Sequence, residues 1–172
     1  MKSNKFNVLI LSAGRRVELV NIWKSAIKDL LGNKCNLFAC DLNSDHSAAC
    51  HFADEKFNIC SCLDDNYQQL LLEKCLEREI KFIIPTIDTE LIPLAKASKL
   101  FLLNGIQILI SDLSNIEKCM DNKKTKNIFD EMNIRSPRIL QKENLTFPCF
   151  IKPIKGSSGI GARKVFSIDQ LS

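Results

Sequence analysis

Short apolar runs alternate with longer amphipathic segments through the first part of the chain, and this alternation limits the possible folds more than any other feature. The apolar runs have the length of buried strands and lie at residues 6–11, 36–40, 56–60, 81–84 and 106–110. Three of the four connections between them have helical periodicity, and the second, which contains His46 and His51, is expected to be a loop. Such alternation is typical of a parallel sheet covered by helices. The sequence therefore predicts an α/β domain.

Capping residues and apolar spacing predict where the helices begin and which faces they bury. The first helix is expected at residues 16–31, before Gly32. Its inward face is expected to contain Val20, Trp23, Ile27, Leu30 and Leu31. Asp64 or Asp65 is expected to cap the second helix. Pro93 is expected early in the third helix, where a missing amide costs least.

The pattern changes after Ser111. Ser114 is expected to cap a lysine-rich helical region that extends to Met132 and is broken near Asp121. Three strands are predicted beyond it, at 138–140, 147–152 and 163–168, and Asp169 is expected to begin another helix. One helical region and three short strands bury too little apolar surface for an independent domain. The sequence therefore predicts one domain at residues 1–112 and an incomplete one at residues 113–172.

Charge and composition narrow the classes of partner. The 24 Lys and Arg residues exceed the 20 Asp and Glu residues, and the excess is concentrated at 118–164. This local excess favours a phosphate-bearing small ligand over a nucleic acid, which usually requires a stronger basic face. No apolar run approaches the roughly 18 residues of a membrane span. Eight cysteines without a CxxC pair predict free thiols and a cytoplasmic setting.

The strongest local signal is the segment FIKPIKGSSGIG at residues 150–161. A lysine at the end of an apolar strand can direct its charge at a phosphate, and the small residues that follow let backbone amides approach the phosphate oxygens. The candidate nucleotide-binding residues here are Lys152, Lys155, Gly156, Ser157, Ser158, Gly159 and Gly161. The segment matches neither the Walker pattern nor GxGxxG. The alternative is an ordinary polar hairpin with lysines at its rim.

Polar residues also follow the first and fourth predicted strands. Ligands of open α/β sheets bind outside the carboxyl ends of the strands, and arginine can grip a carboxylate or a phosphate through two hydrogen bonds. The candidate substrate-binding residues are Ser12, Arg15, Arg16, Thr86, Asp88 and Glu90. Alternatively, one arginine is a solvated helix residue, Asp88 is a helix cap, and Glu90 favours the helix dipole.

The sequence assigns no metal site and no catalytic residue. Cys60 and Cys62 could share a strand face near His46 and His51, but the paired spacing of zinc sites is missing. Both histidines fall in one loop, and the GxSxG pattern is absent. Asp41 follows the second strand and, without a glycine fingerprint, is expected to serve a turn or a helix cap.

Four stretches of the chain, taken together, resemble one family. They are NVLILSAGRRVELV, IIPTIDTELIPLA, ILISDLSNIEKCMDNKKT and FPCFIKPIKGSSGIGARKV, and they span residues 7–165. In this order they resemble the ATP-grasp enzymes, and among these the carbamoyl phosphate synthase large subunit. The resemblance implies a Rossmann-like pre-ATP-grasp domain at residues 1–112, followed by the incomplete first subdomain of an ATP-grasp domain at residues 113–172.

The resemblance also implies roles for individual residues. In the family, the strand lysine that matches Lys152 contacts an ATP phosphate, and the loop that matches residues 156–161 covers it. A second basic residue usually belongs to an Asp-Lys pair early in the preceding helix. Here that place contains Asp121, Asn122 and Lys123, so Lys123 is the candidate.

The family reaction joins a carboxylate to an amine through an acyl phosphate made from ATP. Magnesium ions offset the charge on the phosphoryl oxygens, and the resemblance places their ligands in the second subdomain, beyond residue 172. The resemblance thus implies an amino-terminal fragment of an ATP-dependent carboxylate–amine ligase, inactive alone. Its partners would be ATP, magnesium and a small carboxylate or amine, with the remaining portion on the same or a second chain.

Two other functions stay open at this stage. A nicotinamide-dependent oxidoreductase would use the Rossmann-like part, although the glycine fingerprint is missing. A non-catalytic module would bind a small anion or a nucleotide, for example near Arg15 and Arg16, and would stay inert in the complete protein.

Overall fold

The computed structural model describes residues 6–156 and 159–171, and these fall into two compact units. The first unit is Met1–Leu113 and the second is Ser114–Ser172. Each unit is described by itself below.

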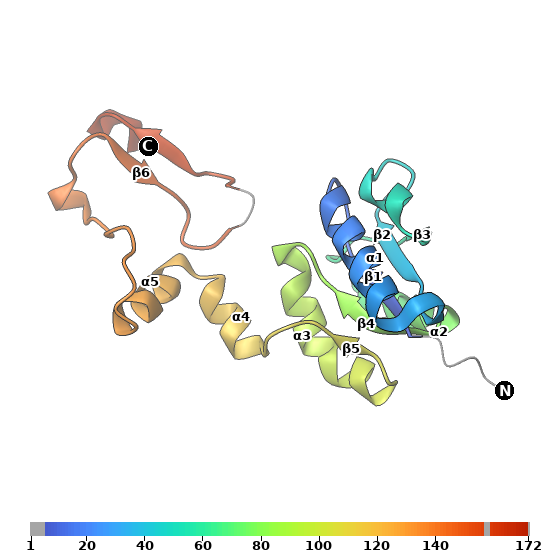
Figure 1. The fold of residues 1–172 in the computed structure, drawn as a ribbon. Helices are drawn as coiled ribbons and strands as arrows, with labels where there is room; N and C mark the ends of the chain where they lie inside the picture. Colours follow the sequence, from blue (N-terminus) through green and yellow to red (C-terminus); the bar gives the residue numbers. More distant parts are fainter. Residues whose placement is uncertain (1–5, 157–158, 172) are drawn as a thin grey trace. The chain divides into compact units, whose positions relative to one another are not determined.

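The first unit is built on a five-stranded parallel sheet (Figure 1). Its strands are β1 (Asn7–Ile10), β2 (Leu37–Asp41), β3 (Glu55–Asn58), β4 (Ile80–Ile84) and β5 (Gln107–Ile108). The strand order is β3-β2-β1-β4-β5, so β1 is central and pairs with β2 on one side and β4 on the other. The predicted α/β fold is confirmed.

Helices cover both faces of this sheet. The connections contain α1 (Val17–Leu31), η1 (Gly32–Lys34), η2 (Ala49–Phe52), α2 (Tyr67–Glu77) and α3 (Asp88–Leu103). Val8 and Ile10 of β1 pack in one core cluster with residues of α1 and η2. Leu9 packs on the other face in a cluster with residues of α2 and α3. The central strand is therefore apolar on both faces, as parallel sheets usually are.

Three details of the predicted helices are wrong. Leu30 is 82% exposed and Leu31 is 39% exposed, because the face of α1 that the core covers ends at Ile27. The residue before α2 is Asn66, and neither Asp64 nor Asp65 caps this helix through its side chain.

Pro93 is the sixth residue of α3 and so lies in the helix interior, not in its first turn. Proline cannot donate the hydrogen bond to the carbonyl four residues earlier. That carbonyl belongs to Thr89, which is exposed, whereas Pro93 is half-buried and its own carbonyl accepts from Gln68 Nε2 of α2 at 2.9 Å.

The second unit combines two helices with a two-stranded antiparallel sheet. Its elements are α4 (Leu113–Cys119), α5 (Asn122–Glu131), η3 (Lys142–Asn144), β6 (Cys149–Ile151), β7 (Arg163–Val165) and η4 (Ile168–Leu171). The predicted break near Asp121 is present. Ser114 lies inside α4 and does not precede it, and residues 138–140 are irregular, so these two predictions are wrong.

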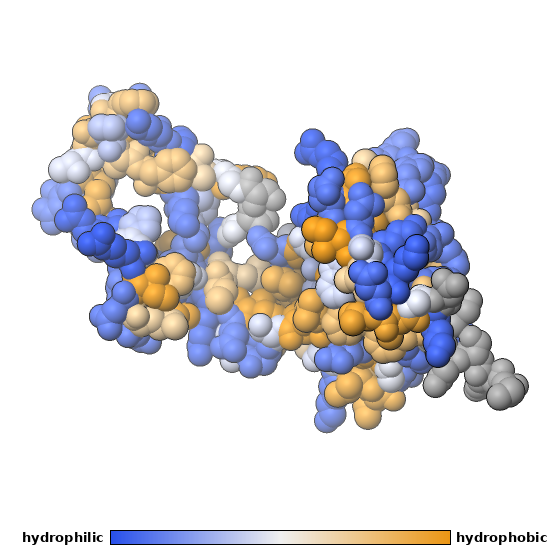
Figure 2. Space-filling view, in the orientation of Figure 1, coloured by the Kyte–Doolittle hydropathy of each residue, from blue (hydrophilic) through white to orange (hydrophobic). Residues whose placement is uncertain are grey.

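Little of the second unit is buried. Among its described residues, the buried apolar side chains are Ile116 and Val165. Large apolar side chains such as Met132, Phe150 and Phe166 are more than half exposed, and apolar groups are visible on the surface (Figure 2). The second unit thus has little apolar core of its own, and its interpretation as an incomplete first subdomain stays a prediction. None of the described helices has the length and apolarity needed to cross a membrane.

Candidate functional site

The first part of the site is the turn that follows β1, residues 12–16, which we call the edge turn. Gly14 has a φ of 55°, which favours glycine, and its amide donates a hydrogen bond of 2.8 Å to Asp41 Oδ2. The Gly14 carbonyl accepts from Ser47 Oγ at 2.9 Å and from the Ala49 amide at 3.0 Å. The expected turn role of Asp41 is confirmed.

Ser12 has the most constrained backbone of the edge turn. Its φ of 45° is unusual for a residue with a side chain and costs roughly 1–3 kcal/mol. The Ser12 hydroxyl donates to Glu90 Oε1. The Ser12 carbonyl lies 2.9 Å from Thr86 Oγ1 and accepts from Arg16 Nη1 at 3.2 Å. Contacts from several parts of the chain thus hold Ser12 in this conformation.

Glu90 is a buried carboxyl group beneath the edge turn. It is 1% exposed, and burial raises its pKa, an effect partly opposed by the Ser12 hydroxyl and by the backbone amides of Thr86 and Ile87. Its Oε2 atom and the Tyr67 hydroxyl are buried without a hydrogen-bond partner among the described residues, although each group shifts the pKa of the other. An unpartnered buried polar atom costs roughly 1–3 kcal/mol.

The structure brings Ser12, Thr86 and Glu90 together through these hydrogen bonds. Arg15 and Arg16 are exposed on the same turn. Asp88 is exposed at the first position of α3, and the residue before the helix is Ile87, so the alternative role of Asp88 as a side-chain cap is not observed.

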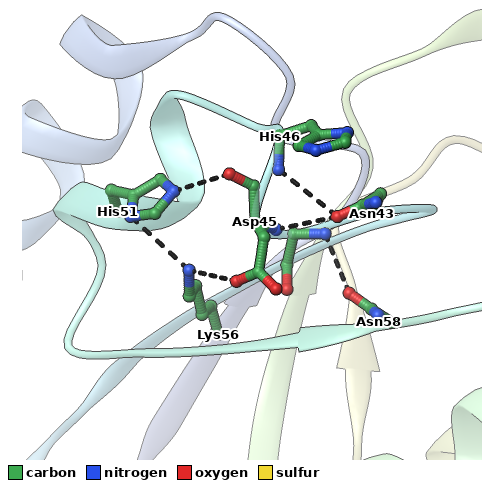
Figure 3. A network of polar contacts seen from close by, with 7 residues as sticks. Asn43, Asp45, His46, His51, Lys56 and Asn58 are labelled. Carbon is green, nitrogen blue, oxygen red and sulfur yellow. Dashed lines mark hydrogen bonds and ion pairs between the residues drawn. The ribbon is translucent and has the colours of Figure 1, made fainter.

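The loop that supports Gly14 is held by its own polar network (Figure 3). Asp45 accepts from Lys56 Nζ at 2.7 Å, and this bond lowers the pKa of the Asp45 carboxyl. His51 Nε2 lies 2.9 Å from the Asp45 carbonyl, and its Nδ1 lies 3.5 Å from Lys56 Nζ. Both ring nitrogens of His51 thus face polar groups of this loop. His51 is thus a structural residue of this loop.

The second part of the site lies at the end of β6 in the second unit. Lys152 follows this strand, and its Nζ donates a hydrogen bond of 2.6 Å to Asn122 Oδ1. Asn122 Nδ2 donates to the Pro153 carbonyl at 2.8 Å, and the Asn122 amide donates to the Ile154 carbonyl at 2.9 Å. Asn122 therefore connects the start of α5 to the lysine and to the chain that leads into the hairpin.

The residues beside Asn122 complete the start of α5. Asp121 caps the helix by accepting from the amides of Lys123 and Lys124 at 2.9 and 3.1 Å, and the Lys124 amide makes the largest contribution to the lowered pKa of Asp121. Asp121 also forms an antiparallel bridge with Lys155. Lys123 is exposed in the first turn.

Glycines shape the hairpin that follows Lys152. Gly159 and Gly161 have φ values of 72° and 76°, and a Cβ on Gly161 would lie 2.9 Å from Pro153 Cγ. Gly156 is exposed next to Lys155. The predicted residues Ser157 and Ser158 lie outside the described residues.

Two features of the site were missed from the sequence. The sequence points to Lys123 as the second basic residue, whereas the side chain that contacts Lys152 is that of its neighbour Asn122. The burial of Glu90 was detectable, because Glu90, Leu94, Ala97 and Phe101 recur at helical spacing and all lie on the buried face of α3.

A cavity of about 200 Å³ lies elsewhere in the first unit, beside the start of β2. Its lining includes Lys24, Lys28, Cys35 and Asp54, and Lys24 forms an ion pair of 2.6 Å with Asp54. No predicted site residue lines it. Among the described residues, no group of three or more His, Cys, Asp or Glu could hold a metal ion.

Comparison with known proteins identifies the family. The family model for the PylC-like N-terminal domain matches residues 8–109, which is more than half of the chain. The chain belongs to the PylC-like N-terminal domain family. The match covers the sheet and helices of this PylC-like domain. The sequence matches no curated protein.

Solved structures share the fold of this PylC-like protein. The chain superposes on Rhizobium etli pyruvate carboxylase with a TM-score of 0.65 and 12% identity, over 98% of this chain and 16% of that one. It also superposes on the biotin carboxylase domain of Hydrogenobacter thermophilus 2-oxoglutarate carboxylase, which was solved with MgADP and bicarbonate. The TM-score is 0.63 and the identity 19%, over 97% of this chain and 39% of that one.

A third neighbour is the D-alanine–D-alanine ligase of Bacillus anthracis, with a TM-score of 0.55 and 19% identity, over 96% of this chain and 51% of that one. The chain thus spans about half or less of the length of these three relatives. At these identities the likeness concerns the fold alone. The prediction is confirmed for the fold, which this chain shares with biotin carboxylases and a D-alanine–D-alanine ligase, whereas the narrower resemblance to carbamoyl phosphate synthase stays a prediction.

Glu90 should make the stability of the first unit depend on pH. Because its pKa is raised in the folded state, the folded protein retains a proton that the unfolded chain has lost, and stability falls as pH rises above about 4.5. Glu90→Gln removes this loss, so the free energy of unfolding of the variant should rise relative to that of the wild type as pH increases. Urea unfolding between pH 4 and 8, followed by the fluorescence of the single tryptophan, Trp23, measures the difference.

Glu77→Gln is the control for this experiment. Hydrogen bonds from Arg78 and Lys74 lower the pKa of Glu77, so its contribution is present above its ordinary pKa and is lost as pH falls. The free energy of unfolding of the Glu77 variant should therefore fall relative to that of the wild type as pH rises. Parallel curves for the wild type and Glu90→Gln would contradict the assignment of a raised pKa to Glu90.

Asn122→Ala should loosen the junction between α5 and β6. It removes the bonds to Lys152 Nζ and the Pro153 carbonyl, and at about 1 kcal/mol for exposed bonds the amides of β6 and β7 should exchange roughly fivefold faster. Hydrogen exchange followed by NMR measures this. Asn127→Ala, at an exposed position of the same helix, should leave the rates unchanged. Equal rates in both variants would show that Asn122 does not hold the junction.

Proposed function

We propose that this chain is the amino-terminal part of an ATP-dependent carboxylate–amine ligase that works through an acyl phosphate. It shares its fold with part of a biotin carboxylase domain that was solved with MgADP and with part of a D-alanine–D-alanine ligase. The observation that carries the proposal is the lysine amine of Lys152, held by Asn122 where the glycine-bearing hairpin begins.

The hairpin end of the second unit is the proposed nucleotide site. Lys152 neutralises charge on the phosphates of ATP, with Lys155 and Lys123 as further cations. The glycines let backbone amides approach the phosphate oxygens, and the predicted Ser157 and Ser158 belong to the same segment. The described residues therefore suit a nucleotide polyphosphate in charge and in backbone freedom.

The edge turn of the first unit is the proposed site for the acid substrate. Arg15 and Arg16 are exposed there, after the carboxyl end of the central strand, where ligands of open α/β sheets bind. A guanidinium group can hold a carboxylate through two hydrogen bonds. The proposed substrate is accordingly a small carboxylate, which an amine then joins.

The proposed reaction has two displacements. A substrate carboxylate oxygen attacks the terminal phosphorus of ATP and ADP leaves. The amine nitrogen then attacks the carbonyl carbon of the acyl phosphate and inorganic phosphate leaves. Bound magnesium would offset phosphoryl charge, and the family resemblance places its ligands outside this chain. The chain alone should be inactive. A cytoplasmic location is part of the same proposal.

Lys152→Ala should weaken the binding of ATP to this chain by about tenfold, because it removes a charge that contacts a phosphate. Isothermal titration with ATP measures the affinity. Lys164→Ala removes one cation from the neighbouring strand β7 and should change the affinity by less than about twofold. Equal losses in both variants would indicate nonspecific attraction, and an unchanged Lys152 variant would refute the nucleotide site.

Joining the chain to its downstream portion distinguishes the ligase from a non-catalytic binding module. A ligase should then release ADP and phosphate when a suitable carboxylate and amine are present, and Lys152→Ala should abolish this release. An assembled protein that binds ATP but remains inert with a broad panel of acids and amines would favour the binding module.

A further inference from the structure

Glu90 lies where a direct contact with substrate is difficult. It is the third residue of α3, and its side chain is among the largest that are fully buried in the described chain. Arg15 and Arg16, by contrast, are exposed on the edge turn. The carboxyl group thus lies inside the protein, while the cations that could meet an anion are outside.

Polar contacts join Glu90 to the edge turn rather than to a counter-ion. The Ser12 hydroxyl donates to its Oε1, and among the described residues no cation forms an ion pair with it. Its Oε2 and the Tyr67 hydroxyl have no hydrogen-bond partner of standard geometry. The backbone amides of Thr86 and Ile87, at the start of α3, also stabilise the charged form of Glu90, so helix capping accounts for part of its burial and leaves the contact with Ser12 to be explained.

Ser12 supplies that explanation. Its backbone is left-handed, a conformation that persists in a serine only where surrounding contacts impose it. Glu90 holds the Ser12 side chain, while Thr86 contacts the Ser12 carbonyl. If the Ser12 backbone left its left-handed conformation, the rest of the edge turn, from Ala13 to Arg16, would change direction.

We propose that Glu90 is a positioning residue, which fixes Ser12 and thereby the edge turn that presents Arg15 and Arg16 to an anionic ligand. The inference rests on the proposed function, because it takes the edge turn to be the binding site of the acid substrate. It assigns Glu90 a role through Ser12, in place of the direct substrate contact predicted from the sequence. A side chain that accepts a hydrogen bond is needed at this position, and a negative charge is not.

The experiment uses the 172-residue chain, inorganic phosphate as the probe, and ¹H–¹⁵N NMR. Two observables are recorded, the phosphate-dependent shifts of the amides of Gly14, Arg15 and Arg16, and hydrogen exchange of the Gly14 amide. The exchange rate reports on the edge turn without any ligand, since the Gly14 amide is bonded to Asp41.

Glu90→Leu should speed the exchange of the Gly14 amide by about tenfold, because the turn opens locally. It should weaken phosphate binding by about fivefold, as expected if the competent turn is populated about a fifth of the time. Ser12→Ala, which removes only the hydroxyl, should act in the same direction and serves if Glu90→Leu does not fold. Glu90→Gln should restore both properties to within about twofold of the wild type, since its amide oxygen still accepts from Ser12.

Leu94→Ala is the matched control, because Leu94 is fully buried one helical turn further along α3. It lowers global stability by opening a cavity. It should leave the phosphate affinity of the folded protein and the local opening of the Gly14 amide unchanged.

Two results would overturn the positioning role. One is a Glu90→Gln variant that folds but loses phosphate as severely as Glu90→Leu, since the charge itself would then be required. The other is an exchange rate in Glu90→Leu that equals the rate in Leu94→Ala. If the wild type shows no saturable shifts with phosphate, the edge turn is not the binding site of the acid substrate. The exchange rates still decide whether Glu90 positions the turn.

Discussion

The left-handed turn at the end of the central strand is the constraint on which the first unit depends. β1 lies between β2 and β4, and residues 11–16 must turn the chain that leaves it toward α1. Ser12 and Gly14 both have positive φ. Neighbouring segments hold this geometry: Asp41 at the end of β2, Ser47 in the loop, and Glu90 in α3. The sheet therefore positions the candidate substrate site through side chains that come from three other parts of the chain.

The second unit uses a simpler arrangement to place a charge. Asn122 fixes Lys152 Nζ and the Pro153 carbonyl with one side-chain amide, and Asp121 caps the helix from which Asn122 projects. Gly161 leaves room for Pro153, whose ring a Cβ there would meet at 2.9 Å. The unit buries few of its own apolar side chains. Its order thus depends on polar contacts and close backbone approach more than on a core.

Periodicity predicted the sheet, because strands buried on both faces appear as continuous apolar runs. It failed where packing decides: Leu30 continues the apolar face of α1 but lies beyond the part that the core covers. The helical spacing of Glu90 with Leu94 and Phe101 indicated a buried carboxyl group. A carboxylate near the start of a helix, however, is usually solvent-exposed and interacts favourably with the helix dipole, so the sequence alone favoured the other interpretation. The contacts of Asn122 join residues thirty positions apart, which no local pattern contains.

In the proposed function, the nucleotide binds the chain at Lys152 and the glycine-bearing hairpin. The most direct measurement is a ¹H–¹⁵N NMR map of the protein during titration with ADP. Binding at the hairpin should produce saturable shifts of the amides of Asn122, Lys155 and Gly161, with little change around the cavity that Lys24 and Lys28 line. Shifts confined to that cavity, or no shifts at the hairpin at saturating ADP, would contradict it.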